Sequence, residues 1–159
     1  EAELGRLSGQ EDDWEVAARD ACLTDPDQAG EYVARTDVDA LAVCIGNVHG
    51  KYTRPPELDF ERLAAIGKAV SLPLVLHGTS GLPDVLIERS IAHGVSKFNV
   101  NTELRQAALS AATAYLQSAP APELIGLMEA QIDAMQMPIK EKLALFGSVG
   151  RAAGGPETR

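Results

Sequence analysis

The sequence predicts an α/β protein built on a parallel sheet, with about four strand–helix units followed by helices. Two observations predict this class. Short apolar runs alternate with longer amphipathic stretches, which is typical of strand–helix repetition. After residue 102 the alternation stops, and two stretches rich in Ala, Leu and Met follow with no strand signal between them. Four such units are half of the eight that close a (β/α)8 barrel.

Four segments are predicted as strands. Residues 40–45 are almost wholly apolar and end at Gly46, as expected for a strand that is covered on both faces. The other three are residues 1–4, 74–76 and 96–100. Residues 8–13 are polar and acidic, and we expect them to form a flexible loop.

Helix start and stop signals predict five helices, at residues 28–35, 60–70, 84–93, 103–117 and 123–146. Asp25 and Pro26 give the first one an N-cap and a proline in its first turn. Pro138 should kink or divide the last one. We therefore expect the half-barrel unit at residues 1–118, a helical appendix at 119–149 and a disordered, glycine-rich tail at 150–159.

Charge and composition exclude several classes of protein. The chain has 14 Lys and Arg against 23 Asp and Glu, a formal net charge of −9 and no basic cluster, which excludes a nucleic-acid partner. Its apolar runs are too short to cross a membrane. The two cysteines do not indicate a disulfide framework, so we expect a reducing, cytoplasmic environment. The chain opens without Met or a signal-like segment, so we expect it to be cut from a longer protein.

Polar residues gather where the predicted strands end. His49 and His77 each stand in a His-Gly pair just after an apolar strand, and neutral imidazole is a zinc ligand. Local hydrogen bonding at a loop is the alternative for each histidine. Gly78-Thr79-Ser80-Gly81 leads into a helix and could cradle a phosphate with backbone N–H groups, or form an ordinary turn. Glu11 either lies in a solvated loop or reaches the site as a proton donor or acceptor.

Four motifs together resemble the class II, metal-dependent ketose-bisphosphate aldolases, which cleave fructose or tagatose 1,6-bisphosphate. They lie in family order at residues 1–12, 46–52, 76–81 and 97–104. The resemblance spans residue 1 to about residue 105 and matches the second, C-terminal half of such a barrel.

The resemblance implies a role for each matching residue. His49 and His77 would be zinc ligands, Glu3 a further or alternate ligand, and Glu11 an aid to proton transfer. The resemblance is also compatible with a monovalent cation in addition to the zinc. The residues that would hold the dihydroxyacetone phosphate end of the substrate are Gly50, Gly78, Thr79, Ser80, Asn99, Val100, Asn101 and Thr102.

Two departures from the family pattern limit what the resemblance implies. The family's Asp-His pair, which supplies an acid/base carboxylate and another zinc histidine, belongs to its N-terminal half, and no Asp-His occurs in this chain. We therefore expect an incomplete site that needs an N-terminal half-barrel, in a homo-oligomeric dimer or tetramer. Thr79 stands where glycine or alanine is commoner, and Asn101 where one branch has Asp, so the choice between fructose and tagatose bisphosphate stays open.

Two other functions are compatible with the residues. An isomerase or epimerase on a phosphosugar barrel would share the phosphate loop but would not need two metal histidines. A non-catalytic assembly module would cleave no sugar bisphosphate even with an N-terminal partner.

Overall fold

The computed structural model describes residues 1–159 apart from 12–13, 17–20, 51, 53 and 152–159. Its contacts divide the chain into two compact units, Glu1–Val100 and Asn101–Arg159. The first contains all the strands, and the second is helical.

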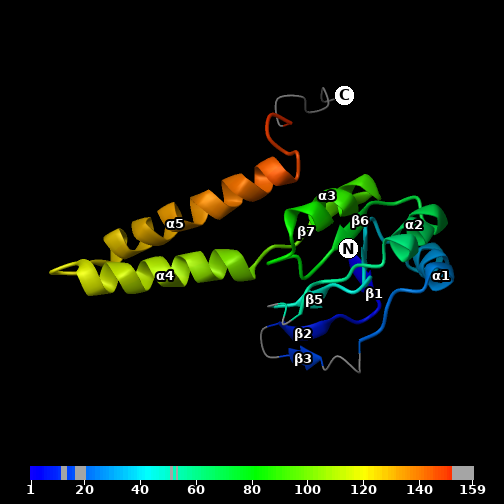
Figure 1. The fold of residues 1–159 in the computed structure, drawn as a ribbon, viewed down its shortest axis with the longest axis horizontal. Coiled ribbons are helices and arrows are strands. Elements are labelled where there is room, and N and C mark those ends of the chain that lie inside the picture. Colours follow the sequence, from blue (N-terminus) through cyan, green and yellow to red (C-terminus); the bar gives the residue numbers. More distant parts are fainter. Residues whose placement is uncertain (12–13, 17–20, 51, 53, 152–159) are drawn as a thin grey trace. The chain divides into compact units, whose positions relative to one another are not determined.

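Four parallel strands form the main sheet of the first unit, in the order β1-β4-β6-β7 (Figure 1). They span Ala2–Leu4, Leu41–Val43, Leu74–Leu76 and Val95–Phe98. All four predicted strands are present, and the predicted α/β class is confirmed. Strand β4 is shorter than predicted, because the Ile45 N–H donates to the Asn47 side chain (2.8 Å) instead of extending the strand.

The core of this unit lies around the two central strands, β4 and β6. Every residue of both strands is buried, as expected for parallel strands that are covered on both faces. Helices α1 (Pro26–Thr36), α2 (Phe60–Ala69) and α3 (Asp84–Ala92) follow β3, β5 and β6 along the chain. Leu63 and Ile66 of α2 are fully buried, so this helix contributes its apolar face to the core.

A second, three-stranded sheet was not predicted. Its strands are β2 (Ser8–Glu11), β3 (Trp14–Val16) and β5 (Val48–His49), in the order β3-β2-β5. The expectation of a flexible loop at residues 8–13 is thus wrong for residues 8–11, while 12 and 13 lie outside the described residues. The segment lacks the apolar alternation that predicts a strand. It is a strand because its backbone pairs with β3 and, at Gly9 opposite His49, with β5.

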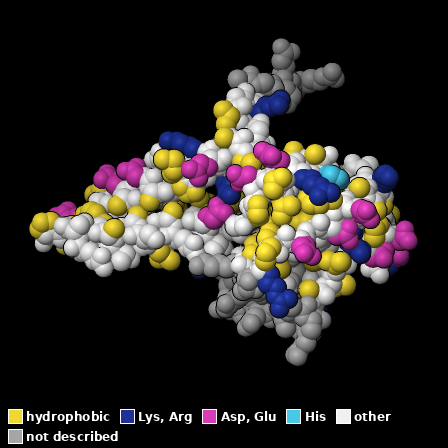
Figure 2. Space-filling model, viewed as in Figure 1, with side chains coloured by type: hydrophobic (Ala, Val, Ile, Leu, Met, Phe, Trp, Pro, Cys, Tyr) yellow, Lys and Arg dark blue, Asp and Glu magenta, His cyan; other side chains and the backbone are white. Residues whose placement is uncertain are grey.

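The second unit is a helical hairpin of α4 (Thr102–Ser118) and α5 (Leu124–Leu145). Pro138 lies inside α5, which continues to Leu145, so of the two predicted outcomes, a kink or a division, the division does not occur. Neither helix, each described in full, has a buried residue. Figure 2 shows hydrophobic side chains exposed along the hairpin. The large hydrophobic residues that are exposed in this unit include Leu109, Leu116, Leu124, Ile125, Met128, Ile132 and Met137.

Three other sequence expectations concern single features. Both cysteines are free, with Cys22 exposed and Cys44 buried, as the sequence predicts. Within the described ranges, none of the helices combines the length and the apolar character that a membrane span requires. The predicted disordered tail falls, from residue 152 onward, outside the described residues.

The N-cap of α1 provides a test of local stability. Asp25 accepts hydrogen bonds from the backbone N–H groups of Asp27 (2.9 Å) and Gln28 (3.0 Å). We expect Asp25→Ala to lower the free energy of unfolding by about 1 kcal/mol, because both N–H groups lose their acceptor. Urea denaturation measures the change. Asp25→Asn keeps an acceptor oxygen and should remain close to wild type; an equal loss in both variants would contradict the capping role.

Candidate functional site

Two histidine rings from separate parts of the chain come together at the carboxyl ends of the strands. His49 ends β5, and His77 directly follows β6. Their ring centroids lie 6.5 Å apart, and the ring planes are tilted by 43°. The two histidines that the sequence singles out are therefore neighbours.

The loops that carry these histidines touch through their backbones. Gly78 has a φ of +63°, and a Cβ there would overlap the carbonyl oxygen of Val48, the residue before His49. The Tyr52 hydroxyl accepts from the Val48 N–H (3.3 Å) and donates to the Gly78 carbonyl (2.9 Å), so it joins both loops. Burial raises the pKa of Tyr52, which keeps the hydroxyl in its donating form.

A buried amide also holds the loops together. Asn47 is 1% exposed, and its side-chain oxygen accepts from the Ile45 N–H. Its side-chain nitrogen donates to the carbonyl of Val43 (3.3 Å) and to that of His77 (3.0 Å). The His77 backbone is thereby tied to the end of β4. Sequence reasoning missed both Asn47 and Tyr52, although each lies in the motif around His49.

Carboxylates engage both ring nitrogens of His77. Glu3 Oε2 lies 2.7 Å from Nδ1, and Glu1 Oε1 lies 2.9 Å from Nε2. Ionised carboxylates only accept, so these two contacts favour the protonated ring, which donates from both nitrogens. The hydrogen bond to Glu3 is the main cause that raises the pKa of His77; burial opposes it, and the bond to Glu1 adds to it.

Lys97 of β7 extends this cluster. Its Nζ donates to Glu1 Oε2 (2.8 Å) and to the side-chain oxygen of Asn99 (2.6 Å). The hydrogen bond from Lys97, followed by the one from His77, lowers the pKa of Glu1, so this carboxylate stays ionised. Glu1 and Lys97 were not predicted as site residues. The strand alternation held a signal for Lys97, because it stands two residues before Asn99 and so on the same face of β7.

The sheet register explains how these long side chains meet. Glu3 pairs with Ala42, Ala42 with Val75, and Val75 with Lys97, so all four side chains point to one face of the sheet. The two central positions carry small side chains. This leaves room for charged side chains from the outer strands β1 and β7 to reach across the face.

The predicted phosphate loop follows His77. Thr79 is 1% exposed, and its hydroxyl donates to the Asn99 carbonyl (2.9 Å), which joins the ends of β6 and β7. Ser80 is 7% exposed in the same loop. Gly78 and Gly81 both have positive φ, so the loop turns sharply before α3. Thr79 and Asn99 are thus brought together.

The two histidines fit a metal ion as part of a ligand set. A zinc–nitrogen bond of about 2.0–2.1 Å puts each ring centroid about 3.2 Å from the ion, so two tetrahedral imidazoles have centroids about 5.2 Å apart. The observed 6.5 Å is longer than this, so a shared ion would require the two rings to move closer together. In the part of the chain that the structure describes, no group of three potential ligands is assembled.

The other predicted site residues lie in several places. Gly50 follows His49, and Val100 ends the first unit, whereas Asn101 and Thr102 begin α4 in the second unit. The backbone of Glu11 ends β2, two residues past the pair of Gly9 and His49, and its side chain lies outside the described part.

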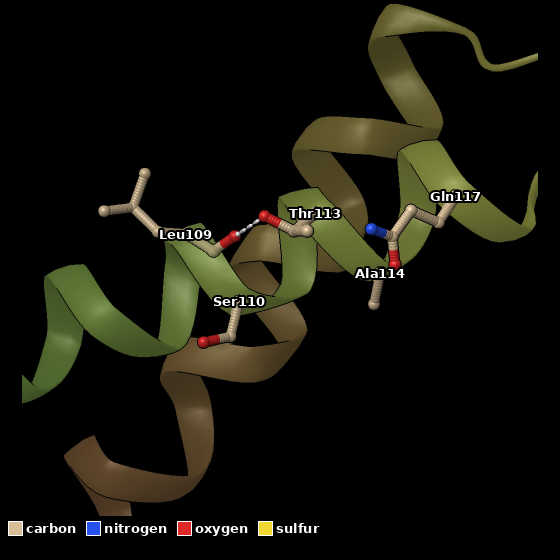
Figure 3. A pocket seen from close by; sticks show the side chains of 5 residues that line it. All are labelled: Leu109, Ser110, Thr113, Ala114 and Gln117. Carbon is tan, nitrogen blue, oxygen red and sulfur yellow. Dashed lines mark hydrogen bonds between the residues drawn. The ribbon is translucent and has the colours of Figure 1, made fainter.

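A pocket of about 400 Å³ lies on α4, away from these residues in the sequence. Its lining comes from one helix: Leu109, Ser110, Thr113, Ala114 and Gln117 (Figure 3). The Thr113 hydroxyl donates to the Leu109 carbonyl (2.9 Å). Because none of the lining side chains is titratable, this pocket offers no acid, base or charged ligand for chemistry.

Comparison with known proteins adds independent information. Residues 1–151 match the family model of class-II fructose-bisphosphate aldolase. The chain is similar to the YdjI aldolase from Escherichia coli K12, at 42% identity over 82% of this chain and 46% of that one, with a TM-score of 0.71. It is also similar to a candidate fructose-1,6-biphosphate aldolase from Coccidioides immitis, at 34% identity over 95% of this chain and 53% of that one, with a TM-score of 0.83.

A third structure extends the likeness of fold. The fructose-bisphosphate aldolase Fba from Campylobacter jejuni has 20% identity over 79% of this chain and 45% of its own, with a TM-score of 0.64. The chain thus spans about half the length of these solved chains. This agrees with the half-barrel prediction.

A pair of glycine variants tests the contact between the loops. Gly78 and Gly81 both have positive φ, but a Cβ meets Val48 at Gly78 and nothing within 4 Å at Gly81. We expect Gly81→Ala to cost about 1–2 kcal/mol of unfolding free energy from backbone strain alone. Gly78→Ala should cost clearly more, because the loops must also separate. Thermal and urea unfolding of both variants measure the difference, and equal costs would contradict the close approach.

The raised pKa of His77 predicts a pH-dependent stability in the metal-free protein. The folded state binds the His77 proton more tightly than the unfolded chain does. This tighter proton binding adds to the free energy of unfolding. The added stability is fully present below the unfolded pKa of about 6.5 and is lost as pH rises through the folded pKa. With chelator present, the unfolding free energies of wild type and His77→Gln should differ most at low pH and converge at high pH. Glu3→Gln should weaken this dependence, and a pH-independent difference would refute it.

Proposed function

Because this chain belongs to the class-II fructose-bisphosphate aldolase family, we propose that its protein is a zinc-dependent ketose-bisphosphate aldolase. The reaction is the reversible cleavage of fructose or tagatose 1,6-bisphosphate to dihydroxyacetone phosphate and glyceraldehyde 3-phosphate. The observation that carries the proposal is the meeting of His49 and His77, with ring centroids 6.5 Å apart, beside Glu3.

The chain's own groups would have distinct tasks. His49 and His77 would hold the ion, and Glu3, which is hydrogen-bonded to His77, would orient that ring or serve as an alternate ligand. A bound divalent ion supplies Lewis-acid polarisation of the ketone carbonyl and stabilises the enediolate charge. Glu11 would accept or donate a proton near the reacting atoms. A monovalent cation beside the phosphate is part of the same proposal.

The phosphate end of the substrate would bind at the loop after β6. The backbone of Gly78, Thr79 and Ser80 turns there between β6 and α3, and backbone N–H groups in such a turn bind anions without a lysine. The proposal also includes Gly50 and Asn99 as substrate contacts.

A complete site needs ligands beyond those in the described residues. We therefore infer that an N-terminal half-barrel supplies the remaining metal ligand and an acid/base carboxylate. The exposed apolar side chains of the α4–α5 hairpin support assembly into a homo-oligomer, because exposed apolar surface of this kind favours burial.

Histidine variants of the full-length protein test the assignment, with His93 as a matched control. His93 caps the C-terminus of α3, where its Nδ1 bonds the Arg89 carbonyl (2.7 Å) and its ring lies 5.2 Å from that of Phe60. We expect His49→Ala and His77→Ala to lose bound zinc and at least about 100-fold in kcat for aldol cleavage. His93→Ala should keep both. Metal analysis and a coupled cleavage assay give the two readouts.

The possible results separate the proposal from its rivals. If both site variants keep wild-type metal content, the assignment of His49 and His77 fails. A phosphosugar isomerase or epimerase would interconvert substrates without stoichiometric zinc. A non-catalytic module would leave fructose and tagatose bisphosphate uncleaved even when the N-terminal half is present.

A further inference from the structure

Lys97 occupies an unusual place in the site. It lies on the same sheet face as Glu3, and its ammonium contacts two acceptors that no other described interaction brings together, Glu1 and the side chain of Asn99. The Lys97 side chain is 51% exposed and that of Glu1 28% exposed, so the pair is open to solvent on one side. The contact therefore contributes little to global stability, and a different reason for the arrangement is needed.

The contact with Lys97 fixes the side chain of Asn99 in one orientation. An ammonium only donates, so the carboxamide must offer its oxygen to Lys97, and its NH2 group is turned the other way. The Asn99 backbone is already fixed by two bonds, because its N–H donates to the Leu76 carbonyl (3.2 Å) and its carbonyl accepts from Thr79. Only the side-chain torsions of this exposed residue remain for Lys97 to set.

A direct action of the Lys97 charge on an anionic substrate is the competing explanation. The ammonium already faces the Glu1 carboxylate at 2.8 Å, which offsets much of its field. Its shortest contact, at 2.6 Å, is to a neutral amide oxygen. Both contacts favour a role in holding other side chains over a role in attracting an anion.

The geometry points to Lys97 as a positioning residue that presents the Asn99 NH2 group to the substrate. This inference rests on the proposed aldolase function and deepens it. Lys97 orients the carboxamide before the substrate arrives, so the donor does not have to be ordered during the reaction. Glu1 holds the ammonium in place from the opposite side.

A double-mutant cycle in the full-length protein tests this role. Lys97→Met keeps the length of the side chain but removes the donor, and we expect it to lower kcat/KM by about tenfold or more, as loss of a charged hydrogen bond does. In the Asn99→Ala background the same substitution should change kcat/KM less than about twofold, because the side chain that Lys97 positions is already absent. Lys97→Arg retains donors and should restore most of the activity. Zinc content should stay at the wild-type level in all four variants, the double variant included.

A second readout does not depend on activity. This chain contains three asparagines, at positions 47, 99 and 101. In asparagine-labelled protein, the side-chain NH2 resonance that disappears in Asn99→Ala should shift in Lys97→Met and much less in Lys97→Arg. If wild type cleaves no ketose bisphosphate, the aldolase proposal fails. The Asn99 resonance then still tests whether Lys97 orients the Asn99 side chain. Additive losses in the cycle, or an unmoved resonance, overturn the inference.

Discussion

The close approach of two backbone loops is the constraint on which the rest of the site depends. Gly78 packs against the carbonyl of Val48, where any side chain would intrude. Asn47 and Tyr52 then bridge the same two loops with hydrogen bonds to backbone groups. The spacing of the two histidine rings is therefore set mainly by the backbone. A site fixed in this way changes less with side-chain motion than one assembled from long, independent side chains.

The charges around His77 balance within the cluster. Glu1 and Glu3 carry two negative charges, and Lys97 and the protonated form of His77 carry two positive ones. Partly buried charges are stable only when they are paired and hydrogen-bonded, and each of these four groups has at least one charged partner. Binding of a divalent ion to His77 would displace one of the carboxylates or the ring proton of His77. The groups that hold the proposed ligand His77 thus also balance its charge while no ion is bound.

Much of this could be predicted from the sequence, and the limits have physical causes. The four strands of the main sheet could be predicted from apolar runs, and the two site histidines from their His-Gly pairs, because these signals are local. The strand at Ser8–Glu11 could not be predicted, because it forms by pairing with a distant segment. Gly9 pairs with His49, which lies 40 residues later in the sequence. Asn47 and Lys97 were missed for a similar reason: the bonds that join them to the rest of the site, to the His77 carbonyl and to Glu1, reach residues 30 and 96 positions away in the sequence.

Thr79 illustrates how the structure changes the meaning of a sequence departure. The family resemblance makes glycine or alanine the expected residue there, which at first suggests a changed contact with the substrate. In this chain the hydroxyl is turned toward the Asn99 carbonyl and is almost fully buried. It adds a tie between the ends of β6 and β7. A residue with no hydroxyl would lose that tie, so this position contributes to the rigidity of the loop.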